Sequence, residues 1–226
     1  MRRILEAMTG PPKDPEQARA AMVEHQLRDR GVTDEHVLAA MGAIPREAFV
    51  PDASRRDAYA DGALPIESGQ TISQPLMVAK MTERLEVEPG DRILEIGTGS
   101  GYQAAILAWL GAHVTTLERQ AALIPAARAR IHALELAGSV DIREADGSVG
   151  DVDGAPWDGI IVTAAAPSIP DALREQLADG GRLVIPVGSR DRQLLTIVTR
   201  HGNVWDERTD GYCVFVPLIG AAGFAG

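Results

Sequence analysis

The second half of the sequence alternates short apolar runs with stretches of helical character, and this pattern restricts the fold more than any other feature. The runs lie at 92–96, 113–118, 140–145, 158–164 and 182–188. Helical stretches or a Gly- and Asp-rich loop separate them. Strands that are apolar on both faces and alternate with helices are typical of parallel α/β sheets. We therefore expect a doubly wound, mostly parallel, Rossmann-like α/β sheet over residues 89–226.

The C-terminal end of the chain breaks this alternation. The segment QLLTIVTR (193–200) is followed by a turn at 201–203 and then by YCVFVPL (212–218). These runs lie too close together for a crossover helix between parallel strands. We expect antiparallel strands at one edge of the sheet.

The residues before the first apolar run have a different character. Up to about residue 85 the sequence indicates helices and loops, without a convincing strand. We expect residues 1–15 to form a loose tail and residues 16–88 a helical cap with the substrate-side segment. Together with the sheet, residues 16–226 then make a single domain, which suits a chain of 226 residues.

Capping residues and prolines mark the expected elements of this helical cap. Asp14 and Pro15 favour a helix that begins there and ends at Gly31. Thr33 is then expected to cap a second helix. Prolines at both ends of the segment IPREAFVP (44–51) favour an irregular, extended conformation.

Composition excludes several classes of protein. The single cysteine, Cys213, rules out an internal disulfide framework and a multi-cysteine metal site, and favours the cytoplasm. The net charge of −10, without a basic cluster of any length, argues against a nucleic-acid partner. No apolar run approaches the roughly 20 residues that a membrane span needs. We therefore expect no membrane partner. The five histidines show no metal-site pattern, so we also expect no metal.

The strongest local motif is LEIGTGSGY, residues 94–102. Its glycines follow a strand and precede a helix, in the spacing GxGxG. A dinucleotide-binding loop would place its third glycine at position 102, which is Tyr102. Glu95 would repel a pyrophosphate but attract an ammonium group, which indicates S-adenosylmethionine as the ligand. A nicotinamide cofactor, or a glycine turn that only connects strand and helix, are the alternatives.

Acidic residues follow the next two strands. Glu118 lies about 20 residues beyond the loop, where a carboxylate accepts hydrogen bonds from ribose hydroxyls. Asp146 and Gly147 follow the third strand, where they could bind an adenine edge. On local grounds Asp146 fits a plain Asx turn equally well. The carboxyl ends of these strands form the crevice in which open α/β sheets bind ligands.

A polar segment, GQTISQP, spans residues 69–75 and precedes a run with helical apolar spacing. Ser73 is suited to cap that helix, with Pro75 in its first turn. Capping would leave Gln70, Thr71 and Gln74 unexplained, so these side chains are candidates to face a ligand.

Several motifs together resemble one family. VEHQLRDRG, IPREAFVP, YADGALPIESGQTISQP, EIGTGSGYQAA, VTAAAP, GGRLVIPVG and FVPLIG are similar to the protein-L-isoaspartate O-methyltransferases. The similarity extends from about residue 20 to 223, with Trp157 standing where a smaller aromatic residue is expected. It implies the S-adenosylmethionine-dependent methyltransferase fold. It also implies methylation of the side carboxylate of isoaspartyl residues in damaged proteins and peptides, by a monomeric enzyme.

The resemblance also implies a role for each motif residue. Ser73 corresponds to the active-site serine. The implied cofactor contacts are Thr71, Ile72 and Gln74 beside the cofactor, Glu95, Gly97, Thr98, Gly99 and Gly101 in the methionine-binding loop, Glu118 at the ribose, and Asp146 and Gly147 at the adenine.

The chemistry of this reaction fits the polar segment. A carboxylate with a pKa of ~4 is already an anion at neutral pH, so no base is needed to activate it. The site has to align the anion, hold it by hydrogen bonds and exclude water. Ser73 is then a positioning donor rather than a covalent nucleophile. A methyltransferase for another substrate class, or a binding protein without turnover, are the competing hypotheses.

Overall fold

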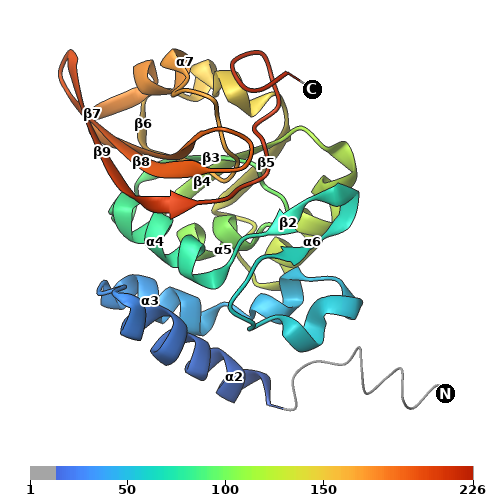
Figure 1. The fold of residues 1–226 in the computed structure, drawn as a ribbon. Coiled ribbons are helices and arrows are strands. Elements are labelled where there is room, and N and C mark those ends of the chain that lie inside the picture. Colours follow the sequence, from blue (N-terminus) through green and yellow to red (C-terminus); the bar gives the residue numbers. More distant parts are fainter. Residues whose placement is uncertain (1–13, 226) are drawn as a thin grey trace.

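The computed structural model describes residues 14–225, and a seven-stranded sheet forms their centre (Figure 1). The strand order is β5-β4-β3-β6-β7-β8-β9. The first five strands in this order, from β5 through β4, β3 and β6 to β7, pair in parallel. The pairs β7-β8 and β8-β9 are antiparallel. This confirms the predicted doubly wound, mostly parallel sheet with antiparallel edge strands. The strands are β3 Arg92–Ile96, β4 His113–Glu118, β5 Val140–Glu144, β6 Trp157–Val162, β7 Leu177–Gly188, β8 Gln193–His201 and β9 Val204–Cys213.

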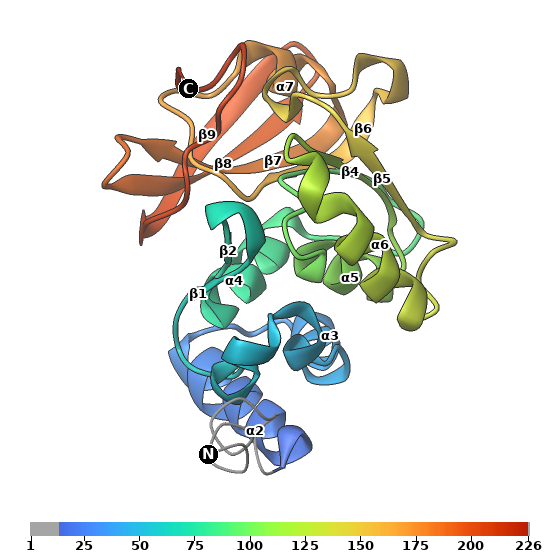
Figure 2. The same cartoon turned by 90° about the vertical axis from the view of Figure 1, so that its right-hand side faces the viewer.

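Helices cover both faces of this sheet. α4 (Pro75–Leu85), α5 (Tyr102–Trp109) and α6 (Ile124–Ala133) lie on one face, and the short α7 (Asp171–Glu175) lies on the other (Figures 1 and 2). Successive strand residues point to opposite faces, so Ile93 joins the core under α4 and α5 while Leu94 joins the core under α7. By the same alternation Glu95 points toward α4 and α5.

The N-terminal helices form a layer beyond α4 and α5 (Figure 2). The helical run from Pro15 to Arg30 consists of α2 (Pro15–Ala21), a π-helical stretch and a 3-10 turn. Asp14 caps it by accepting a 3.0 Å hydrogen bond from the Gln17 amide, and Gly31 ends it in a left-handed conformation. The predicted limits of this helix are therefore confirmed.

Two predictions for this region were wrong. The residue that caps α3 (Glu35–Ala43) is Asp34, whose carboxylate accepts from the His36 and Val37 amides. The amide and hydroxyl of Thr33 instead donate to the carboxylate of Glu83, which lies on α4. The segment 44–51 is not extended throughout, because residues 46–49 form a 3-10 turn that buries Arg46 and Phe49.

The expectation that the chain up to about residue 85 contains no strand was also wrong. Two short strands, β1 (Leu64–Pro65) and β2 (Thr71–Ile72), pair antiparallel. The turn between them has positive φ angles at Ser68 and Gly69. Strands of two residues are too short to show an alternating pattern, so the sequence carries no signal for this hairpin.

Two element limits in the C-terminal half differ from the prediction. The stretch between the apolar runs at 158–164 and 182–188 was expected to be helical up to the second run, but α7 ends at Glu175 and β7 already begins at Leu177, which pairs with Trp157 in β6. The last strand was expected over 212–218, but β9 runs from Val204 to Cys213. Most residues of β9 are exposed and polar, as an edge strand allows, so hydrophobic patterning does not show it.

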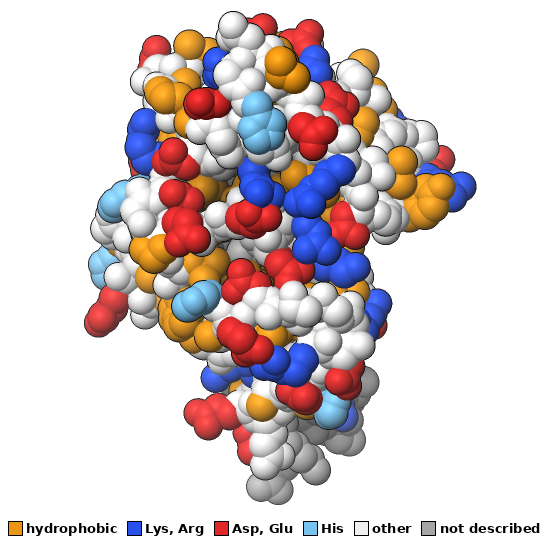
Figure 3. Space-filling view, turned by 90° about the vertical axis from the view of Figure 1, so that its left-hand side faces the viewer, with side chains coloured by type: hydrophobic (Ala, Val, Ile, Leu, Met, Phe, Trp, Pro, Cys, Tyr) orange, Lys and Arg blue, Asp and Glu red, His pale blue; other side chains and the backbone are white. Residues whose placement is uncertain are grey.

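Charges of both signs lie side by side on the surface in Figure 3. Some of these side chains join elements of the fold, as in the ion pair of Arg84 on α4 with Asp210 on β9 at 2.6 Å. None of the helices within residues 14–225 has the length and apolar character required to cross a bilayer.

Candidate active site

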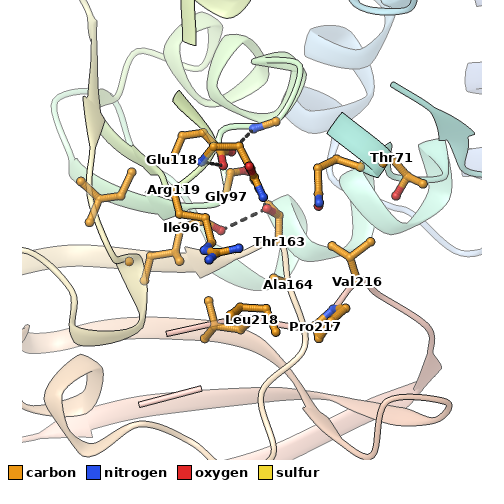
Figure 4. Close-up of a pocket in the computed structure, with 17 residues that line it drawn as sticks. Thr71, Ile96, Gly97, Glu118, Arg119, Thr163, Ala164, Val216, Pro217 and Leu218 are labelled. Carbon is orange, nitrogen blue, oxygen red and sulfur yellow. Dashed lines mark hydrogen bonds between the residues drawn. The ribbon is translucent and has the colours of Figure 1, made fainter. Parts of the chain in front are cut away.

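A pocket lies at the carboxyl ends of the parallel strands (Figure 4). The space between its walls, solvent mouth included, is about 840 Å³, within the range of ligand clefts. In Figure 4 Glu118 and Arg119 lie on one side and Thr71 and Val216 on the other. The lining residues are Gly69, Gln70, Thr71, Ile96, Gly97, Gly99, Leu117, Glu118, Arg119, Gln120, Gly147, Thr163, Ala164, Val216, Pro217, Leu218 and Ile219.

The glycine loop forms the floor of this pocket. Gly97 has a φ of 98°, which is costly for any residue with a Cβ. A Cβ at this position would also overlap the hydroxyl of Thr163. That hydroxyl lies 2.7 Å from the Gly97 carbonyl and 3.0 Å from the Ile96 carbonyl, so it ties the loop to the end of β6 (Figure 4). Glycine is therefore required at position 97 for both backbone conformation and space.

Glu118 joins the glycine loop to the end of β4. One carboxylate oxygen accepts from the Gly99 amide at 2.9 Å, and the other accepts from the Gln120 amide at 2.8 Å. A carboxylate offers about four acceptor positions, so two backbone donors leave it able to accept further hydrogen bonds. Glu118 lines the pocket and is held rigidly there. It has the geometry to bind a pair of hydroxyl groups.

Glu95 has a different environment. Its side chain is completely buried, and neither carboxylate oxygen has a hydrogen-bond partner among residues 14–225. Burial raises the pKa of Glu95 to about 8; the neighbouring Thr116 hydroxyl acts to lower it, and the nearby Glu118 carboxylate acts to raise it. The Thr116 hydroxyl lies at hydrogen-bond distance from the Thr98 hydroxyl and makes no well-oriented bond to Glu95. A buried carboxyl group without a donor is costly in a protein interior. Such a group is well suited to a cationic ligand that arrives from outside.

Glu95 lines a second, smaller cavity between the sheet and α4. This cavity shares Thr71, Gly97, Gly99 and Thr163 with the main pocket, so the two spaces adjoin. The other lining residues are Ile72, Ser73, Val78, Met81, Glu95, Thr98, Ser100, Tyr102 and Gln103. Ser73 and Glu95 therefore border one space, next to the main pocket.

The structure does not support the capping role considered for Ser73. α4 begins at Pro75, and the N-cap position belongs to Gln74, whose side chain makes no capping bond. Ser73 lies one residue further out, partly buried, and its hydroxyl has no hydrogen-bond partner within the described part of the chain. This hydroxyl remains able to bind a ligand in the second cavity.

Some of the predicted cofactor residues lie outside both cavities. The amide of Gln74 donates to Asp61 at 2.7 Å. Gly101 is the N-cap residue of α5, has a left-handed conformation and packs against Ala127. The carboxylate of Asp146 accepts from Ser148 and from the Ala221 amide, so the Asx turn that local sequence allowed is present. Thr98, by contrast, lines the second cavity, and its hydroxyl lies 2.7 Å from that of Thr116.

The pocket also contains residues that sequence reasoning missed. Thr163 and Ala164 follow β6, and residues 216–219 form a wall next to them. The two segments are joined because the Ala165 amide donates to the Val216 carbonyl and the Leu218 amide donates to the Ala165 carbonyl. Both segments belong to sequence motifs, VTAAAP and FVPLIG, but their residue types carry no chemistry that would have marked them.

Comparison with known proteins decides the family. The model of the protein-L-isoaspartate(D-aspartate) O-methyltransferase family matches residues 17–223. The chain belongs to this family. It is 52% identical to the protein-L-isoaspartate O-methyltransferase of Methylorubrum populi over 92% of this chain and 98% of that one. Its identity to the enzyme of Methanoregula boonei is also 52%, over 96% and 99% of the two chains.

Solved structures agree with the family assignment. A protein-L-isoaspartate O-methyltransferase with 27% identity superimposes with a TM-score of 0.79, over 91% of this chain and 67% of that chain. A family structure from Plasmodium falciparum, solved in complex with S-adenosyl-L-homocysteine, gives 26% identity and the same TM-score over 89% and 98% of the chains. Family membership confirms the predicted S-adenosylmethionine-dependent carboxyl methyltransferase. The buried, unpartnered Glu95 and the pocket-lining Glu118 fit this cofactor.

Proposed function

We propose that this chain transfers a methyl group from S-adenosylmethionine to the side carboxylate of L-isoaspartyl residues, and that Ser73 and Glu95 mark where acceptor and donor meet. The observation that carries this division of the site is the unpartnered carboxylate of Glu95 in the cavity that Ser73 also borders. The reaction starts the repair of damaged proteins and peptides. The methyl group that S-adenosylmethionine supplies is activated by its positive sulfur.

Glu95 is proposed to hold the ammonium end of the cofactor. The ammonium carries three donors and a positive charge, and both oxygens of Glu95 lack a donor. A charge-assisted hydrogen bond in a dry site is stronger than one between neutral groups. This contact would turn a destabilising buried carboxylate into a binding determinant.

The pocket at the strand ends is proposed to hold the adenosine portion of the cofactor. Glu118 has acceptor capacity left for the two ribose hydroxyls after binding the Gly99 and Gln120 amides. Gly147 lies on the adenine side of the pocket, where a side chain would collide with Ile96. Apolar residues at 217–219 supply a surface for the ring.

Ser73 and Thr71 are proposed to orient the substrate carboxylate. Both hydroxyls border the cavity next to the glycine loop. Ile72, Val78 and Met81 add apolar walls to this space, which help to exclude water from a reaction that cancels charge. The carboxylate is ionised at neutral pH, so the site needs no general base.

The acceptor is proposed to be a polypeptide, not a nucleic acid or a membrane lipid, and the enzyme to act as a monomer in the cytoplasm. The net charge of −10 would repel a phosphate backbone. A sequence with a single cysteine, Cys213, has no internal disulfide, which suits a reducing compartment. Burial raises the pKa of this thiol to about 11, which argues against a nucleophilic role.

Transfer of labelled methyl groups to matched peptides tests this function. One peptide carries L-isoaspartate and the other carries L-aspartate in the same sequence. We expect label on the isoaspartyl peptide alone, and its loss in mild base, because the product is an ester. Equal labelling of both peptides, or a label stable to base, would contradict the proposed substrate and the proposed bond.

A further inference from the structure

The last described residues fold into a compact hook, residues 219–224, at the rim of the main pocket. Ile219 and Phe224 form a β-bridge, and the Phe224 amide donates to the Leu218 carbonyl at 2.7 Å. Arg190 stacks over the Phe224 ring at 5.0 Å and donates to the carbonyl of Ala225. The hook is therefore an ordered element with internal contacts of its own.

Two side chains on the loop after β5 hold this hook. The carboxylate of Asp146 accepts from the Ala221 amide at 2.8 Å. The hydroxyl of Ser148 accepts from the Ala222 amide at 3.0 Å and donates to Asp146 at 2.7 Å. Asp146 and Ala221 are 75 residues apart in sequence. Two consecutive amides of the hook nevertheless donate to the side chains of one Asp–Ser pair on the loop after β5.

Gly220 allows the close approach that these bonds require. A Cβ at this position would overlap both the Asp146 carboxylate and the Ser148 hydroxyl. The φ angle of Gly220 is not in the left-handed region, so an alanine here would act through space alone.

The hook is also connected to the pocket. Leu218 and Ile219 line the main pocket, as does Gly147, which lies between Asp146 and Ser148 in sequence. Leu218 and Ile219 also lie shortly before the Ala221 and Ala222 amides that Asp146 and Ser148 bind. Ser148 is fully buried, and neither Ser148 nor Gly220 lines the pocket. An effect of these two residues on the cofactor must therefore pass through the hook.

We propose that Asp146 and Ser148 are positioning residues that hold the C-terminal hook, so that Leu218 and Ile219 form the wall against the adenine end of S-adenosylmethionine. Asp146 then contributes to cofactor affinity through the Ala221 amide. Burial acts to raise the pKa of Asp146, but the hydrogen bonds from Ala221 and Ser148 outweigh it and keep the pKa below the usual value. This inference rests on the proposed function of the pocket.

Calorimetric titration of the full chain with S-adenosyl-L-homocysteine tests this proposal. We expect Ser148→Ala and Gly220→Ala each to weaken binding by about fivefold, the effect of one lost hydrogen bond. The double variant should be little weaker than either single variant, because both act on one contact. Ser139→Ala, at the opposite end of β5, is the matched control and should bind as the wild type does.

Two further readouts separate this role from general destabilisation. Hydrogen exchange at the Ala221 and Ala222 amides should become faster in Ser148→Ala, while exchange in β3 and β4 stays unchanged. The methylation rate at saturating S-adenosylmethionine should also be unchanged, with only KM for the cofactor raised.

Unchanged affinity in both variants would overturn the proposal, and so would losses that multiply in the double variant. Either result, obtained with a wild-type chain that binds the cofactor product and methylates isoaspartyl peptide, would leave the proposed function in place. A wild-type chain that does not bind S-adenosyl-L-homocysteine would instead refute the proposed site.

Discussion

The amide of Gly99 donates to the carboxylate of Glu118 at 2.9 Å, which joins the glycine loop after β3 to the end of β4. The second carboxylate oxygen accepts from the Gln120 amide. Glu118 is therefore both a proposed ligand of the ribose and a structural support of the loop on which the cofactor rests.

Glu118→Ala is expected to weaken S-adenosyl-L-homocysteine binding by at least ~1.5–3 kcal/mol, the usual cost of losing hydrogen bonds to a charged group. Glu118→Gln retains one acceptor oxygen and should lose less. Calorimetry measures both. Glu144→Ala is the matched control, because this exposed carboxylate occupies the paired position on β5. Unchanged affinity in Glu118→Ala would remove Glu118 from the ribose site.

The raised pKa of Glu95 predicts that cofactor binding depends on pH. With a pKa of about 8 the free protein carries a neutral Glu95 at lower pH, and binding of an ammonium group must release that proton. The affinity should rise toward about pH 8 by up to tenfold per pH unit, until the amino group of the ligand itself loses its proton. Titration in buffers of different ionisation enthalpy counts the released proton.

The matched variant for this measurement is Glu95→Gln. It should bind more weakly, and the proton release that is specific to Glu95 should be absent from it. An equal proton count in wild type and variant would show that Glu95 does not face the ammonium group.

The same group predicts a stability effect in the ligand-free protein. The folded-state pKa lies above the ordinary value of 4.5, so the folded state binds the extra proton between these two values. The stability contributed by Glu95 is therefore fully present below about pH 4.5 and is lost as pH rises to about 8. Glu95→Gln should remove this loss and stabilise the protein at high pH, by at most about 5 kcal/mol.

Denaturant unfolding of the wild type and of Glu95→Gln at both ends of this pH range tests the prediction. The difference in unfolding free energy should be small at low pH and should grow as the pH rises. A difference that is independent of pH would mean that Glu95 is not the group whose protonation is linked to folding.

Ser73→Ala is expected to lower the methylation rate strongly while the affinity for S-adenosyl-L-homocysteine changes little. The free hydroxyl borders the second cavity, and no bond to the rest of residues 14–225 is lost when it is removed. Single-turnover kinetics and calorimetry measure the two quantities separately. Ser168→Ala, an exposed serine after β6, serves as the control. Equal losses of rate and affinity would contradict the positioning role.

Local sequence predicted the parallel strands well. β3 and β4 have the predicted limits, because apolar runs buried on both faces end sharply at charged residues and glycines. β9 was placed too late because an exposed edge strand does not need an apolar pattern. The hairpin of β1 and β2 went unseen because each strand has only two residues.

The candidate site likewise contains residues that the sequence predicted and residues that it did not. Spacing and residue type identified the glycine loop, Glu95 and Glu118, since an acid and three glycines around a strand end have few other uses. The position of Ser73 outside the helix cap, the Asp61 contact of Gln74 and the pocket wall at residues 216–219 could not be predicted. Each of these depends on which distant segment lies next to the residue.

Local pattern and motifs were sufficient to predict the alternation of helices with the parallel strands, the family, and the chemical groups available at the strand ends. The burial of Glu95 without a partner and the contact of Asp146 with the C-terminal hook could be learned from the three-dimensional fold alone. The physical reason is that burial and hydrogen bonding depend on segments brought together by sheet pairing. The neighbours of a side chain are set when those segments pack together. These neighbours then determine its pKa and the hydrogen-bonding capacity that it has left for a ligand.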